Sequence, residues 1–93
     1  MRTVRWTEKA QSELRETIAY IADDSPYYAQ TIRDRINGAA HNLGRYNTGR
    51  IGRQPGTFEK LVPGLPYILV FRVEGIGVEI LHLLHTARHY PPR

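Results

Sequence analysis

The sequence predicts an α+β fold in which an N-terminal α-helical hairpin packs on one face of an antiparallel β-sheet. Two stretches with helical periodicity occupy the first half of the chain. Strand-like runs rich in β-branched and aromatic residues occupy the second half. The expected order of elements is therefore β-α-α-β-β-β. A chain of 93 residues fits one domain, so residues 1–93 are expected to fold as a single unit.

The helical hairpin is predicted from capping residues and from a short connection. Residues 3–6 form a first strand, and Thr7 then stands at an N-cap position. Ser25 and Pro26 supply the N-cap and the first helical position of a second helix. Helices joined so closely are expected to lie antiparallel. Gly38 inside the second helix costs about 1 kcal/mol relative to alanine, which predicts a close approach of another element there.

The second half of the chain predicts a loop followed by three strands. Residues 45–56 contain three glycines, one proline and three arginines, which indicates a loop. Residues 57–62, 67–73 and 78–85 are predicted strands, and their short connections favour an antiparallel meander. The last two strands are apolar on both faces, so part of the face opposite the helices should also be covered.

Charge is distributed unevenly along the chain, whose net charge is +4. Residues 7–44 carry four Lys or Arg against six Asp or Glu, whereas residues 45–93 carry seven against three. The basic half is a candidate face for a polyanion or an acidic partner, and the alternative is an ordinary solvated surface. Because there is no cysteine, no secretory signal and no apolar run long enough for a membrane span, we expect a cytoplasmic protein without membrane contact.

Three separated stretches of the chain resemble the motifs of one protein family. Residues 49–62 read G-R-I-G-R-Q-P-G-T-F-E-K-L-V, where the family has G-R-x-G-R-x-x-G-T-R-E-L-V. Residues 66–73 read P-Y-I-L-V-F-R-V, close to its P-Y-I-L-V-Y-R-V strand. Residues 78–88 read V-E-I-L-H-L-L-H-T-A-R, close to V-E-I-L-R-V-L-H-x-A-R. The chain thus resembles the RelE/ParE toxin superfamily of type II toxin-antitoxin systems, and its ParE-like branch in particular.

This resemblance implies a toxin that a cognate ParD-like ribbon-helix-helix antitoxin neutralises in a hetero-oligomer. ParE-like toxins inhibit DNA gyrase without a cofactor, in modules linked to plasmid stabilisation, and would meet nucleic acid only within a target complex. RelE-like toxins instead cleave messenger RNA on the ribosome, with an R-L-V-Y strand whose Arg faces the phosphate. Ile68 stands at that position here, which favours a gyrase inhibitor over an enzyme. A ribosome-dependent endoribonuclease and an inactive relic that only binds antitoxin remain as alternatives.

Two arginines in the predicted loop are candidate target-binding residues. Arg50 and Arg53 stand between glycines, and guanidinium groups bind phosphates or carboxylates through two parallel hydrogen bonds. The alternative is a solvated loop held by an ion pair with Glu59 or Glu79.

The end of the chain carries the other candidate target-binding residues. Arg88, His89 and Tyr90 follow the last strand, and His85 lies just before them. In the ribonuclease alternative, Arg88, His89 and Tyr90 would be catalytic as cation, acid/base and phenol. Otherwise Tyr90 packs over the sheet edge and His89 is solvated. No metal site is expected, because His82 and His85 would point to opposite faces of a strand.

Three tyrosines at the far end of the helical hairpin are candidate antitoxin-binding residues. Tyr20, Tyr27 and Tyr28 lie at the end of the first helix and the start of the second. Tyrosine is enriched at the centres of protein interfaces, which supports this role. The alternative is that at least one of them simply caps the hairpin.

Overall fold

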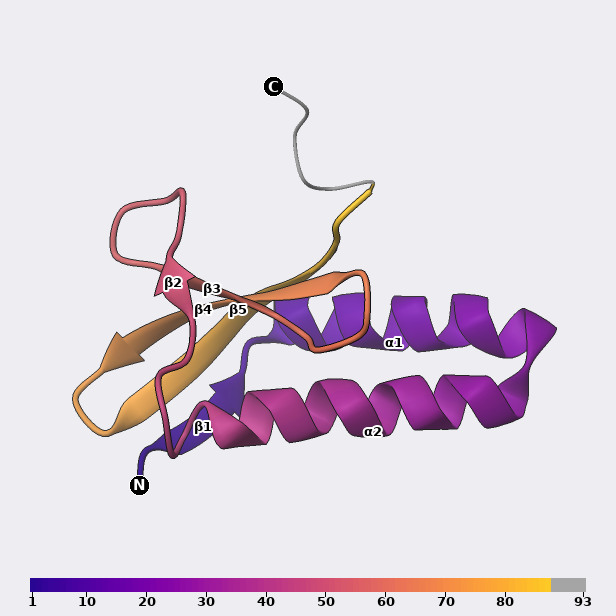
Figure 1. Ribbon diagram of the computed structural model, residues 1–93, viewed down its shortest axis with the longest axis horizontal. Coiled ribbons are helices and arrows are strands. Elements are labelled where there is room, and N and C mark those ends of the chain that lie inside the picture. The colour runs from indigo at the N-terminus through magenta and orange to yellow at the C-terminus, as the bar shows by residue number, and fades with distance from the viewer. Residues whose placement is uncertain (88–93) are drawn as a thin grey trace.

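The computed structural model describes residues 1–87, and it confirms the predicted α+β class. The elements are β1 (Thr3–Trp6), α1 (Glu8–Asp24), α2 (Pro26–Asn42), β2 (Arg50–Ile51), β3 (Phe58–Leu61), β4 (Tyr67–Glu74) and β5 (Gly77–His85). The strands form one sheet in the order β1-β5-β4-β3-β2. The α1–α2 hairpin covers one face of this sheet, while the β2–β3 loop rises on the other side (Figure 1).

The sheet is antiparallel except at its first strand. β1 pairs with β5 in parallel, with Thr3 opposite Gly77 and Trp6 opposite Ile80. Parallel neighbours need a long crossover, and the two helices and three strands between β1 and β5 provide it. The sheet is therefore mixed rather than purely antiparallel. A second difference lies in residues 45–56, where the predicted loop contains the two-residue strand β2, paired with β3 through the backbone.

A single residue separates the two helices. Ser25 donates its backbone N–H to the carbonyl of Ile21 at 3.0 Å, which ends α1. Its hydroxyl oxygen accepts a hydrogen bond from the N–H of Tyr28 at 3.1 Å, which begins α2 with Pro26 in its first turn. The helices consequently run antiparallel, side by side, as predicted (Figure 1).

The hydrophobic core lies between the helical hairpin and the sheet. Its largest fully buried side chains are Phe71, Ile32, Ile36, Leu43, Leu69, Ile80, Val62 and Val78. Along β4, Leu69 and Phe71 belong to this core. Ile68 and Val70 alternate with them and point to the other face, yet they are only 3% and 7% exposed. The face opposite the helices is thus partly covered, as the apolar character of both faces predicted.

The expectation of a close contact at Gly38 is wrong. Gly38 is exposed on α2, and a Cβ atom built on it would meet nothing within 4 Å. At Gly49, in contrast, a Cβ would lie 2.7 Å from the ring of Phe71, so the chain approaches the core too closely there for any side chain. The helical glycine therefore carries only its entropic cost, whereas the loop glycine is required by packing.

We expect Gly38→Ala to stabilise the protein and Gly49→Ala to destabilise it. An exposed glycine within a helix costs about 1 kcal/mol relative to alanine, which corresponds to a rise in Tm of roughly 4–8 °C for a domain of this size. Gly49→Ala serves as the matched comparison, because its methyl group collides with Phe71. Thermal unfolding followed by circular dichroism measures both, and a lower Tm for Gly38→Ala would contradict this reading of α2.

Candidate functional site

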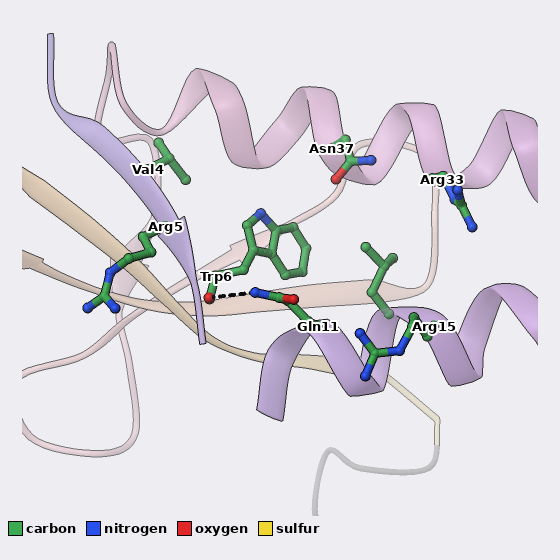
Figure 2. Close-up of a pocket in the computed structure, with 8 residues that line it drawn as sticks. Val4, Arg5, Trp6, Gln11, Arg15, Arg33 and Asn37 are labelled. Carbon is green, nitrogen blue, oxygen red and sulfur yellow. Dashed lines mark hydrogen bonds between the residues drawn. The ribbon is translucent and has the colours of Figure 1, made fainter. Parts of the chain in front are cut away.

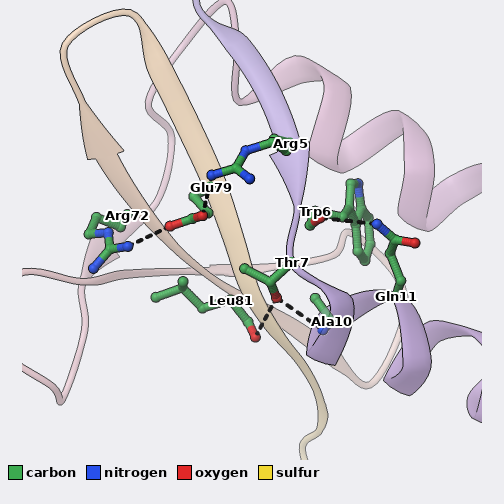
Figure 3. A network of polar contacts seen from close by, with 8 residues as sticks. All are labelled: Arg5, Trp6, Thr7, Ala10, Gln11, Arg72, Glu79 and Leu81. Atoms are coloured by element: carbon green, nitrogen blue, oxygen red, sulfur yellow. Dashed lines mark hydrogen bonds and ion pairs between the residues drawn. The ribbon is translucent and has the colours of Figure 1, made fainter.

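A row of charged side chains crosses the sheet face opposite the helices. Arg5 of β1 and Arg72 of β4 both lie opposite Glu79 of β5. One carboxylate oxygen of Glu79 accepts a hydrogen bond from Arg5 and the other accepts one from Arg72, each at 2.5 Å (Figure 3). Exposed pairs of this kind add roughly 0.2–1 kcal/mol each, so they align the strands more than they stabilise the fold. The row keeps a net positive charge.

The β2–β3 loop, which carries Arg50 and Arg53, is held by hydrogen bonds. The backbone N–H of Arg53 donates to Oε2 of Glu59 at 3.2 Å, and Gly52 donates to the carbonyl of Thr57 at 2.8 Å. Glu59 is only 7% exposed, so its carboxylate is an internal anchor for the loop. The sequence suggested Glu59 or Glu79 as the carboxylate that holds this loop. The structure shows that Glu59 holds it, whereas Glu79 pairs with Arg5 and Arg72.

The structure places His85 away from the two arginines. His85 ends β5 and lies opposite Tyr67, on the helix-facing side, with the two rings edge to face at 5.2 Å. Its Nδ1 accepts the N–H of Ala87 at 3.1 Å. Arg50 lies on β2, which β3 and β4 separate from β5. The remaining predicted target-binding residues, Arg88, His89 and Tyr90, lie outside the described residues.

The three tyrosines predicted to bind antitoxin are all exposed. Tyr20 is 69% exposed on α1, and Tyr27 and Tyr28 are 84% and 53% exposed on the first turn of α2. Tyr20 lines a pocket that also includes Leu83 and His85 of β5, whereas Tyr27 and Tyr28 lie at the start of α2. Their role in antitoxin binding stays a prediction.

Sequence reasoning missed a polar cluster at the half of β5 that β1 leaves uncovered. Oε1 of Glu13, on α1, accepts the N–H of Leu83 at 3.0 Å and lies 3.4 Å from Nδ1 of His82. That nitrogen is buried and makes no hydrogen bond within the described part of the chain. Seventy residues separate Glu13 from Leu83, so no local motif connects them. The pair places a carboxylate beside an imidazole, an arrangement that orients a proton-transfer group.

Within residues 1–87, no three or more His, Cys, Asp or Glu side chains gather in a way that would hold a metal ion. His82 and His85 point to opposite faces of β5, because they lie opposite Val70 and Tyr67 respectively. Neither helix in this part of the chain is long and apolar enough to cross a membrane.

Comparisons with known proteins agree on one family. Residues 4–90 match the family model described as ParE toxin of type II toxin-antitoxin system, parDE. The protein Y4kP of Sinorhizobium fredii is 37% identical over 89 residues, which cover 95% of this chain and 92% of the relative. Toxin RelE2 of Caulobacter vibrioides is 34% identical over 89 residues, covering 95% and 99%.

Solved structures share the fold. The chromosomal ParDE toxin-antitoxin system from P. aeruginosa contains a chain that superposes with a TM-score of 0.82 at 25% identity, covering 91% of this chain and 96% of that one. A chain of the toxin-antitoxin complex RelBE2 from Mycobacterium tuberculosis superposes with a TM-score of 0.60 at 24% identity, covering 90% of each chain. The second likeness concerns the fold alone.

We expect Glu59→Ala to release the β2–β3 loop. The substitution removes the carboxylate that accepts the N–H of Arg53, and losing a hydrogen bond of this kind costs roughly 0.5–1.5 kcal/mol. Trypsin, which cleaves after arginine, should then cut after Arg50 and Arg53 faster than in the native protein. Glu59→Gln keeps an acceptor oxygen, so trypsin should cut this variant more slowly than Glu59→Ala. Glu74→Ala, at an exposed residue, is the control, and equal cleavage of all variants would show that Glu59 does not anchor the loop.

Proposed function

The chain belongs to the ParE toxin family of type II toxin-antitoxin systems, and from this premise we propose that it arrests bacterial growth by inhibiting DNA gyrase in the cytoplasm. A cognate antitoxin, a ParD-like ribbon-helix-helix protein, would neutralise it in a hetero-oligomer. The proposed role as a toxin is supported by the family to which the chain belongs. The choice of gyrase rests on the ParE-like motifs and on one position of β4.

That position is Ile68, where the RelE-like nuclease motif has its phosphate-facing arginine. Cleavage of RNA without a metal needs a cation to stabilise the charge of the phosphate in the transition state. Ile68 is 3% exposed and apolar, so it offers neither charge nor access. Arg72 is on the same strand four residues later, about 13 Å away at 3.3 Å per residue, and its guanidinium is hydrogen-bonded to Glu79. These features favour a toxin that acts by binding over one that cleaves RNA.

A ribosome-dependent endoribonuclease remains the second candidate function. Two observations favour it: a relative 34% identical is named Toxin RelE2, and the Glu13–His82 pair supplies a carboxylate beside an imidazole. Histidine titrates near neutrality and suits proton transfer. Lys9 lines the same pocket as Glu13, so the nuclease would use Lys9, Arg88 or another arginine to stabilise the charge of the phosphate.

The toxin role predicts a simple phenotype. Expression of the chain alone should arrest bacterial growth, and co-expression of the antitoxin encoded beside it should restore growth. Purified toxin should then inhibit gyrase supercoiling, or trap cleaved DNA, while a cell-free translation reaction proceeds. Growth at high levels of soluble toxin would contradict the toxin role and indicate an inactive relic. Blocked translation with unaffected gyrase would replace the gyrase proposal with the ribonuclease.

The end of the chain separates the two mechanisms further. The N–H of Thr86 donates to the carbonyl of Pro66 at 2.9 Å, so a chain truncated after Thr86 keeps this backbone contact and its core. We expect this truncation to abolish toxicity and to leave antitoxin binding largely intact. In the full chain, Arg88→Ala should weaken gyrase inhibition more than His89→Ala does. Loss of activity in His89→Ala together with detectable RNA cleavage would favour proton transfer, and a fully toxic truncated chain would remove the tail from the site.

A further inference from the structure

A cavity of about 490 Å³ opens between the end of α2, the segment that leads to β2, and strand β3. Lys60 of β3 lines it and lies opposite Leu69 of β4, whose side chain belongs to the core. Directly opposite residues of antiparallel strands point to the same face, so the cavity is on the helix-facing side of the sheet. It is therefore separate from the row formed by Arg5, Arg72 and Glu79 on the other face.

The charge of this cavity is of one sign. Arg45 and Lys60 line it, and no Asp or Glu among the described residues does. Neither cation makes an ion pair within residues 1–87. The positive charge continues along the chain, because residues 45–60 contain four Lys or Arg and one Glu. A guanidinium group beside an ammonium group suits a phosphate, so the cavity favours an anionic occupant.

The end of α2 does not oppose an anion here as strongly as a bare helix end would. The last carbonyls of a helix carry partial negative charge, which repels anions. In this protein the backbone N–H groups of residues 43–46 donate to the carbonyls of residues 40–42 at 3.0 or 3.1 Å. These bonds satisfy the carbonyls, and Arg45 adds a full positive charge at the same end. The two cations therefore set the sign of the site.

Tyr46 adds an exposed aromatic ring to the cavity. The residue is 64% exposed, and its ring makes no contact with another aromatic ring within the described part of the chain. Its backbone is held on both sides, because its N–H donates to the carbonyl of Asn42 and its carbonyl accepts the N–H of Thr48, each at 3.0 Å. A ring on a fixed backbone beside two cations is the combination that binds single-stranded nucleic acid, where bases stack and phosphates pair.

We propose that this cavity binds a single strand of nucleic acid, with one base stacked on Tyr46 and the adjoining phosphates paired with Arg45 and Lys60. A duplex would offer only its phosphates, because its bases are stacked on one another. An acidic peptide is disfavoured, since only Ala39 and Pro63 give the lining an apolar surface for a side chain to bury. The inference goes beyond the proposed function, because it assigns contact with nucleic acid to the toxin itself.

Fluorescence anisotropy with purified full-length toxin and a labelled oligothymidylate of roughly ten nucleotides tests the stacking. Tyr46→Ala should raise the Kd roughly 5- to 100-fold, because the base loses its aromatic partner. Tyr46→Phe keeps the ring and should bind like the native protein. A DNA duplex of the same length should bind Tyr46→Ala and the native protein equally, because paired bases do not reach the ring. Circular dichroism checks that each variant is folded.

The salt dependence of the same measurement tests the two cations. Arg45→Gln combined with Lys60→Gln should weaken binding and lower the slope of log Kd against log salt by about 1.4, since each phosphate contact on a single strand contributes about 0.7. Arg15→Gln combined with Arg33→Gln removes the same charge from another place and is the matched control. These two exposed arginines line a separate cavity beside β1, together with Arg5 (Figure 2). The control should retain most of the affinity and of the slope.

The contrary results are equally definite. No binding of the oligothymidylate by the native toxin, or equal affinity of Tyr46→Ala, overturns the inference. Equal losses in the two double variants would indicate a diffuse effect of charge without a site and would overturn it as well. A Tyr46→Phe variant as weak as Tyr46→Ala would assign the effect to the hydroxyl group and contradict stacking. None of these results bears on gyrase inhibition, which is measured separately, so the proposed function stands or fails by its own assay.

Discussion

Thr7 is the residue through which the sheet and the helical hairpin are joined. Its N–H donates to the carbonyl of Ile80 at 3.0 Å, which is the last backbone bond between the β1 end and β5. Its hydroxyl accepts a hydrogen bond from the N–H of Ala10 at 3.1 Å, which caps α1, and donates one to the carbonyl of Leu81 at 3.4 Å (Figure 3). Leu81 is the extra residue of the irregularity in the β4–β5 register. The end of β1, the start of α1 and the bend of β5 are thus set at one point.

This junction determines which surfaces the protein has available for binding. β1 stops at Trp6, so the last residues of β5 lie beside α1, where Glu13 accepts the N–H of Leu83. On the outer side, just before β1 begins, Arg2 donates its N–H to the carbonyl of Gly44. The Arg50/Arg53 loop lies at the opposite edge of the sheet, beyond β3.

Local sequence signals predicted most of the fold but few of the contacts between residues far apart in the chain. Thr7, Ser25 and Pro26 are capping residues whose effect is confined to adjacent turns, so the helix boundaries followed from sequence. The β4 and β5 strands followed from their β-branched and aromatic runs. The parallel partner of β1, the Glu13–Leu83 contact and the meeting of Arg5, Arg15 and Arg33 depend on residues far apart in the chain, which periodicity cannot pair. The expected close contact at Gly38 is wrong because a glycine in a helix looks the same in the sequence whether it is packed or exposed.

Hydrogen exchange of individual backbone amides tests most directly the central claim, that the pairing of β1 with β5 and the cap at Thr7 join the sheet to the helical hairpin. In the free toxin, the amides of Thr3 and Thr7 should exchange slowly, because they donate to β5, and those of Val4 and Trp6 should exchange quickly. In Thr7→Ala, which lacks the capping hydroxyl, the amide of Ala10 should exchange faster than in the native protein. If the amides of Thr3 and Thr7 exchange as fast as those of Val4 and Trp6, β1 is not paired with β5 and this account of the junction is wrong.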